Sequence, residues 1–146
     1  MEATKSPMAE AVFKNLLKQQ NLEHKFEVDS AGISGWQTDQ EPNDFVKTIM
    51  KRCKIPIEHR ARHITVSDFS NFDYLVGMDN YNIRELNRCM DSVKSEANVV
   101  LLGDFNPDTS DKIIMDPYFD NREEDFQKCY TQIRESCVAL LKHLIT

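Results

Sequence analysis

Two short apolar runs separated by a helical pattern constrain the fold of this chain more than any other feature. The runs cover residues 74–78 and 99–102, and both are typical of strands that are covered on both faces. Between them, Ile83 and Leu86 mark a helix at about 80–90. Strands that alternate with helices indicate βαβ units, so we expect an α/β three-layer sandwich with a short parallel sheet. In such sheets ligands bind beyond the carboxyl ends of the strands.

Further elements on both sides of this unit fit the same fold. Ser6 is a good N-cap and Pro7 suits the first helical position, which predicts a helix at about 7–20. Residues 26–30 alternate between apolar and polar side chains, which predicts a third strand. Apolar spacing predicts two more helices, at about 42–53 and 126–144.

Size and charge exclude several classes of protein. A chain of 146 residues fits a single domain with one core. Its 24 acidic and 18 basic residues give a formal charge of -6, which opposes binding to nucleic acid. No apolar stretch reaches the roughly 18 residues that a membrane span needs, and residues 1–5 lack the apolar core of a secretory signal.

The cysteines favour a reducing compartment. The sequence has four, at Cys53, Cys89, Cys129 and Cys137, and no two of them form a CxxC pair. A zinc site is therefore not expected, nor is any other metal or cofactor. We expect reduced, partly buried thiols in a cytoplasmic protein.

Four blocks of sequence carry a family resemblance. They lie at 6–13 (SPMAEAVF), 28–31, 72–87 and 116–118 (DPY), and the spacing between the first and last blocks fits the same family without a shift. They resemble the low-molecular-weight protein tyrosine phosphatases, and the match covers nearly the whole chain. The resemblance implies one phosphatase-like domain over residues 1–146, with a sheet that has four strands in the family. It also implies hydrolysis of phosphotyrosine proteins and small aryl phosphates through a phosphocysteine.

The chemistry of that family needs three groups. A thiolate with a lowered pKa attacks phosphorus from a Cys-x5-Arg loop that follows an N-terminal strand. The planar guanidinium holds two phosphoryl oxygens. An aspartic acid protonates the leaving phenolate and then serves as a base. By resemblance, Asp116 is this general acid and base.

The nucleophile has no counterpart in residues 1–146. Lys5 stands at the position of the arginine, directly before Ser6, and the position of the cysteine falls before Met1. None of the cysteines has an arginine six residues later, and Arg60 comes one position too late after Cys53. We therefore expect a domain that is incomplete at its N-terminus and inactive as it stands.

The resemblance also assigns supporting roles. Three aromatic side chains would wall the substrate pocket: Trp36, Tyr118 and Phe119. Three residues would brace the phosphate loop from behind: Ser30, His59 and Asp79. Ser6 would be the remnant of that loop. Simpler interpretations stay open, namely a partly buried surface tryptophan, an ordinary N-cap at Ser6 and a histidine at position 59 that is merely hydrogen-bonded.

The absent strand would lie between residues 26–30 and 73–77. Its loss would leave those two segments about 10 Å apart, at two strand spacings. Some ten ladder bonds would be lost, worth roughly 5–15 kcal/mol in total, which is the stability of a typical domain. We expect a chain that folds poorly or collapses around a gap, unless something such as a partner's strand fills it.

Two functions stay open at this point. One is a family phosphatase whose catalytic start is absent. The other is a non-catalytic module that binds phosphotyrosine or a partner protein, with Lys5 and the N–H groups of residues 8–10 as an anion site at a helix end. A relative of arsenate reductases ranks last, because it needs reactive cysteines in exposed loops.

Overall fold

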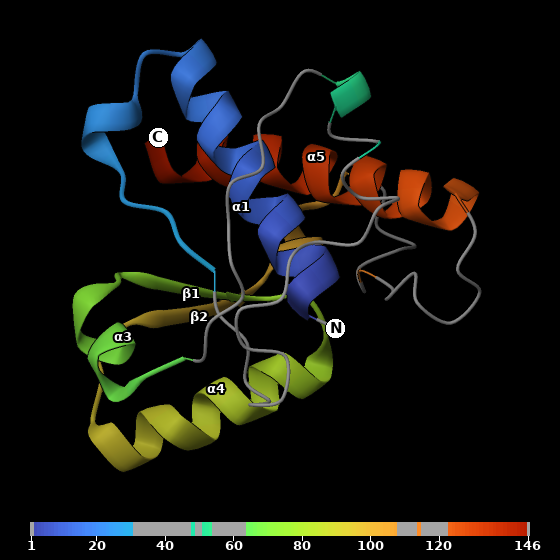
Figure 1. The fold of residues 1–146 in the computed structure, drawn as a ribbon. Coiled ribbons are helices and arrows are strands. Elements are labelled where there is room, and N and C mark those ends of the chain that lie inside the picture. The colour runs from blue at the N-terminus through green and yellow to red at the C-terminus, as the bar shows by residue number, and fades with distance from the viewer. Residues whose placement is uncertain are drawn as a thin grey trace.

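The computed structural model of the chain describes residues 2–30, 48, 51–53, 64–107, 114 and 123–145. Within these ranges the elements form three layers, as Figure 1 shows. Helices α1 (Glu2–Gln19) and α5 (Glu123–Ile145) lie on one side of a small sheet, and α4 (Asn80–Val93) covers the other side. The predicted α/β fold is confirmed.

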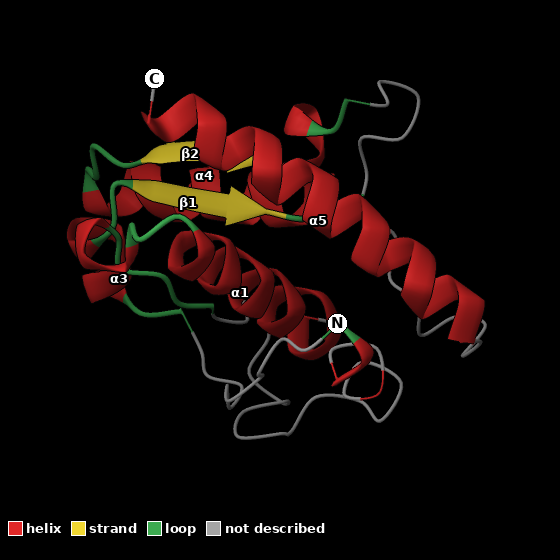
Figure 2. Ribbon diagram, turned by 90° about the horizontal axis from the view of Figure 1, so that it is seen from above, coloured by secondary structure: helices red, strands yellow, loops and turns green. Residues whose placement is uncertain are grey.

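The sheet of the described residues has two parallel strands, β1 (Tyr74–Gly77) and β2 (Asn98–Leu101). Leu75 pairs with Val99, and α4 makes the crossover between the strands (Figure 2). The second run of the sequence forms its strand one residue earlier than predicted, because Leu102 already begins the short 3-10 helix η3 (Leu102–Phe105).

Residues 26–30 are extended but do not form the predicted strand. They follow the 3-10 helix η1 (Glu23–Lys25), and Phe26 has the extended angles φ −135° and ψ 136°. No strand is assigned to residues 26–30, and the sheet of the described ranges contains β1 and β2 alone. The prediction was wrong because alternation specifies an extended backbone, whereas a strand also needs a neighbour.

Helix α1 begins earlier than its capping residue predicted. It starts at Glu2, so Ser6 lies inside the helix and is not its N-cap. Residues 2–5 include glutamate, alanine and lysine, which are good helix formers and continue the helix past Ser6. The N–H groups of residues 8–10 are therefore inside the helix, where such groups bond to carbonyls four residues earlier. The anion site expected at these N–H groups is lost with the cap.

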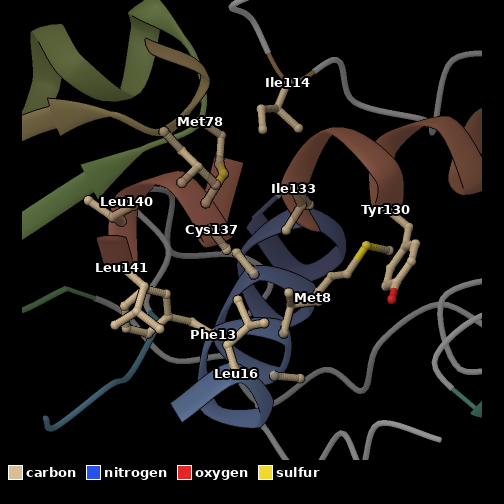
Figure 3. Close-up of a cluster of buried hydrophobic side chains, with 14 of the residues drawn as sticks. Met8, Phe13, Leu16, Met78, Ile114, Tyr130, Ile133, Cys137, Leu140 and Leu141 are labelled. Carbon is tan, nitrogen blue, oxygen red and sulfur yellow. The ribbon is translucent and has the colours of Figure 1, made fainter. Parts of the chain in front are cut away.

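The main core lies between α1 and α5 (Figure 3). Met8 and Val12 of α1 and Ile133 and Leu141 of α5 are each at most 1% exposed. A second cluster of Phe69, Leu75 and Leu86, with partly buried neighbours, joins the sheet to α3 (Val66–Asn71) and α4.

The remaining predictions concern helices. The helix predicted at 80–90 is confirmed as α4, and the one predicted at 126–144 is confirmed within α5. The helix predicted at 42–53 lies mostly outside the described residues, of which Thr48, Lys51 and Arg52 are helical. No helix of the described ranges is long and apolar enough to cross a membrane.

Candidate functional site

The turn from β1 into α4 is fixed by two side chains. The backbone N–H of Asn82 donates a hydrogen bond of 2.9 Å to Oδ1 of Asp79, which is the N-cap of α4. Oδ1 of Asn82 in turn accepts a hydrogen bond of 3.0 Å from the backbone N–H of Met78. Asp79, predicted as a loop-bracing residue, thus lies at the carboxyl end of β1, the edge at which parallel sheets bind ligands.

The segment that leads to Asp116 is anchored at the same edge. The backbone N–H of Ile114 donates to the carbonyl oxygen of Met78 at 3.2 Å, and Ile114 is 1% exposed. Ile114 precedes Asp116 by two residues. This anchor was not predicted from the sequence, although an apolar pair directly before a polar loop is a signal of such an attachment.

The first turns of α1 also contact the residues at the carboxyl end of β1. Met8 follows Ser6 by two residues, is 0% exposed and belongs to one buried cluster with Met78 and Ile114 (Figure 3). Three segments that are far apart in the sequence are therefore held together by their apolar side chains. They are the segments next to Ser6, Asp79 and Asp116.

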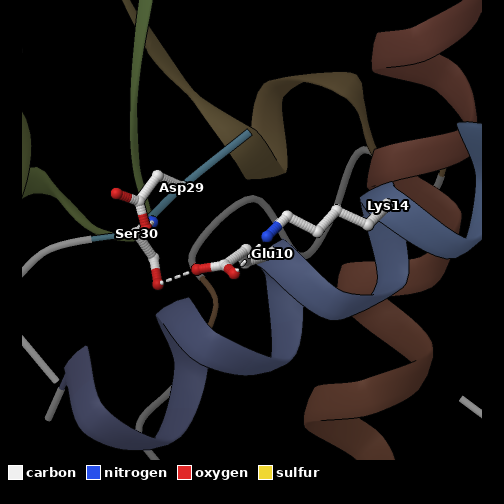
Figure 4. Close-up of polar contacts among 4 residues, drawn as sticks. All are labelled: Glu10, Lys14, Asp29 and Ser30. Carbon is white, nitrogen blue, oxygen red and sulfur yellow. Dashed lines mark hydrogen bonds and ion pairs between the residues drawn. The ribbon is translucent and has the colours of Figure 1, made fainter. Parts of the chain in front are cut away.

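Ser30 is held against α1 by a buried carboxylate (Figure 4). Its hydroxyl donates to Oε1 of Glu10 at 2.8 Å, and the ammonium of Lys14 donates to Oε2 of the same residue at 2.8 Å. Glu10 is 8% exposed, so these bonds compensate for the burial of its charge. Glu10 was not predicted as a site residue, but its position four residues before Lys14 is the signal that identifies the ion pair.

Most of the other predicted site residues lie outside the described ranges. These are Trp36, His59, Asp116, Tyr118 and Phe119. The backbone of Lys5 and Ser6 belongs to α1, and their side chains are not described. Of the predicted set, the structure places the side chains of Ser30 and Asp79.

The thiols differ strongly in their surroundings. Cys129 and Cys137 of α5 are each 2% exposed, and burial raises the pKa of Cys137 to about 12. Cys53 is exposed. Burial, followed by a hydrogen bond with Cys53, raises the pKa of the Tyr130 phenol to about 12. The Cys137 thiol is therefore a neutral core group at physiological pH.

A groove separates residues 26–30 from β1. Its volume is about 510 Å³, and its lining includes Ser30, Met78 and Asn82, which are residues of the candidate site. Cys137 and Leu140 of α5 line it as well. In the described ranges, no group of three or more histidine, cysteine, aspartate or glutamate side chains is arranged to hold a metal ion.

Comparison with known sequences gives a consistent match. The sequence profile of a family described as low molecular weight phosphotyrosine protein phosphatase matches residues 2–146. A human protein described as low molecular weight phosphotyrosine protein phosphatase is 42% identical over 139 residues, which is 94% of this chain and 87% of the human one.

Solved structures match equally well. A drosophila arginine phosphatase is 36% identical with a TM-score of 0.93, over 98% of this chain and 92% of that one. A protein tyrosine phosphatase from Entamoeba histolytica is 28% identical with a TM-score of 0.89, over 98% and 90% of the two chains.

Proposed function

This chain belongs to the low molecular weight phosphotyrosine protein phosphatase family, and we propose that residues 1–146 carry the proton-transfer side of that reaction without its nucleophile. In this proposal Asp116 is the residue that protonates a leaving phenolate. Trp36, Tyr118 and Phe119 wall the pocket for the aromatic ring. The substrate class is phosphotyrosine proteins and small aryl phosphates.

The state of the thiols carries the proposal. A phosphoryl group is accepted by a thiolate, and the thiolate needs a lowered pKa and an arginine that holds the phosphoryl oxygens. The pKa of Cys137 is raised instead, and no cysteine of the sequence has an arginine six residues later. Residues 1–146 by themselves therefore hydrolyse no aryl phosphate.

The position of Ile114, two residues before Asp116, supports the proposed role of Asp116. The bond between Ile114 and Met78 holds the approach to Asp116 at the carboxyl end of β1. Asp79 caps α4 at that end, in keeping with the bracing role that we propose for it and for Ser30. We also place the chain in the cytoplasm, since its four cysteines are free thiols.

Turnover of p-nitrophenyl phosphate tests this function. Purified residues 1–146 are compared with the Asp116→Ala variant, and circular dichroism checks that both have folded. We expect the two rates to be the same, because an acid without a nucleophile has nothing to assist. Two results together would contradict the proposal. They are a rate well above that of the variant and a covalent phosphate on a thiol that the substitution Cys53→Ser removes.

The groove favours a second candidate function, a non-catalytic module that binds a partner protein. Binding of phosphotyrosine itself has less support, because the N–H groups of residues 8–10 lie inside α1. Titration with a phosphotyrosine peptide up to millimolar concentration separates these cases. If no saturable binding is seen, partner binding is the remaining candidate function. Saturable binding would support a phosphotyrosine site.

A further inference from the structure

The backbone of Met78 lies just beyond the end of the ladder between β1 and β2. That ladder ends at Gly77, so Met78 makes its backbone hydrogen bonds outside the sheet. Its N–H donates to Oδ1 of Asn82 at 3.0 Å, and its carbonyl oxygen accepts from the N–H of Ile114 at 3.2 Å. Met78 therefore connects the first turn of α4 to the segment that leads to Asp116.

The two bonds are linked through the backbone of Met78. Peptide units are planar, so only two backbone angles separate the N–H of a residue from its carbonyl group. Before these angles, the side chain of Asn82 holds the N–H. After them, the next residue, Asp79, is held as the N-cap of α4 by a bond of 2.9 Å from the N–H of Asn82. The direction of the Met78 carbonyl group, and with it the position of Ile114, thus depends on Asn82.

Burial strengthens this dependence. Asn82 and Met78 are each 5% exposed. Water therefore cannot readily replace the amide oxygen as an acceptor, and loss of that oxygen would leave a buried N–H without a partner. The backbone of Met78 would then rotate toward another acceptor, and its carbonyl group would rotate with it.

The glycine at position 77 allows α4 to lie this close to β1. A Cβ atom at this position would lie 3.1 Å from Cβ of Asn82 and 2.8 Å from Cδ1 of Ile83. The second distance is shorter than any normal contact of a Cβ atom, so a larger residue would displace the first turn of α4 from the strand. Gly77 is therefore the reason that the amide oxygen of Asn82 reaches the N–H of Met78.

We propose that Asn82 is a positioning residue for the proposed acid. Acting through Met78, it holds Ile114, two residues before Asp116, at the carboxyl end of β1. The proposal rests on the role of Asp116 given above, and it adds the residue on which the position of the acid depends. Apolar packing alone would keep the side chain of Ile114 in the core, but it would leave the direction of the Met78 carbonyl group undetermined.

Amide hydrogen exchange of residues 1–146, measured by NMR, tests the proposal. Asn82→Ala should speed exchange of the Ile114 amide about tenfold or more. The amide of Ile133, a 0% exposed residue of α5, reports the stability of the whole domain and should change much less. A purely structural loss would instead speed exchange of both amides by the same factor. The amide signal of Asp116 should also shift in the variant.

A matched control is available on the same helix. Asn87 is exposed, so Asn87→Ala should leave the exchange of Ile114 and the signal of Asp116 unchanged. Circular dichroism checks that both alanine variants have folded.

Two further measurements cover the case in which Asn82→Ala does not fold. Gly77→Ala should displace α4 and speed exchange of Ile114 more than that of Ile133. In the unmodified chain, the amides of Met78 and Ile114 should exchange through one common opening, with the same dependence on denaturant. The second measurement needs no substitution.

Three results would overturn the proposal. They are equal acceleration of Ile114 and Ile133 in Asn82→Ala, an unchanged Asp116 signal in that variant, and separate openings for Met78 and Ile114 in the unmodified chain. No turnover is measured, so failure here leaves the proposal about the missing nucleophile untouched. Failure of the turnover test, in turn, would not change the exchange of Ile114.

Discussion

The helical half and the sheet half of the described structure differ in how deeply their apolar side chains are buried. Between α1 and α5, Met8 and Ile133 are fully buried, whereas Phe26 and Val28 beside the groove are only partly covered. A helix satisfies its backbone within its own segment, so two helices need only matching side chains to pack. A strand needs the backbone of a neighbour. Among the described residues, α1 and α5 are therefore closely packed against each other, whereas β1 pairs with β2 alone.

The largest effect should come from the helical half. Ile133→Ala removes a side chain that is 0% exposed, and we expect the free energy of unfolding to fall by about 2–5 kcal/mol. Urea denaturation measures it. The control Val138→Ala, at a 41% exposed position of the same helix, should cost less than about 0.5 kcal/mol. Equal losses for the two variants would contradict a packed α1–α5 core.

The second effect is a dependence on alkaline pH. The pKa of Cys137 is raised from 9.0 to about 12, so between these values the thiol ionises in the unfolded chain and stays neutral in the folded one. The stability is fully present below pH 9, and it should fall by about 1.4 kcal/mol for each unit above it.

The variant Cys137→Ala isolates this contribution. Its own stability is lower, but its free energy of unfolding should fall less steeply above pH 9, by about the slope of one thiol. Urea titrations of both proteins at several alkaline pH values measure the difference. Parallel curves for the two proteins would mean that the thiol is exposed to water in the folded state.

A smaller effect should appear at the border of the two halves. The rings of Phe13 and Phe26 meet edge to face, with centroids 6.2 Å apart and planes at 80°. In a double-mutant cycle of Phe13→Leu and Phe26→Leu, we expect a coupling energy of about 0.5–1.5 kcal/mol. No coupling would show that segment 26–30 is not held against α1 in solution.

The smallest effects concern the two bonds of one carboxylate. Ser30→Ala removes the hydroxyl that donates to Glu10, which should cost about 1 kcal/mol. Lys14→Ala removes an ammonium whose side chain is 53% exposed, and it should cost less because water screens that pair. Denaturation of both variants gives the order, and the reverse order would place the stronger support of Glu10 at the surface.

The sequence predicted whatever depends on local pattern. The family and the α/β fold are confirmed, and α4 was predicted well because Ile83 and Leu86 follow helical spacing. Segment 26–30 failed because pairing depends on a distant neighbour. Ser6 failed as a cap because helix formers precede it.

In the predicted site, too, contacts between residues far apart in the sequence were not predicted. Asp79 and Ser30 were named from the sequence, but the attachment of Ile114 to Met78 and the link from Ser30 to Glu10 join residues far apart in the chain. No spacing rule encodes contacts of that kind. The ion pair of Glu10 with Lys14 is different, since it follows from a separation of four residues and was open to prediction.

The tie between Ile114 and Met78 runs from main chain to main chain. Such a bond does not depend on the chemistry of either side chain, so apolar replacements at both positions should preserve it. Proline at position 114 is the exception, since its nitrogen has no hydrogen to donate. Most substitutions at positions 78 and 114 should therefore leave this backbone hydrogen bond available.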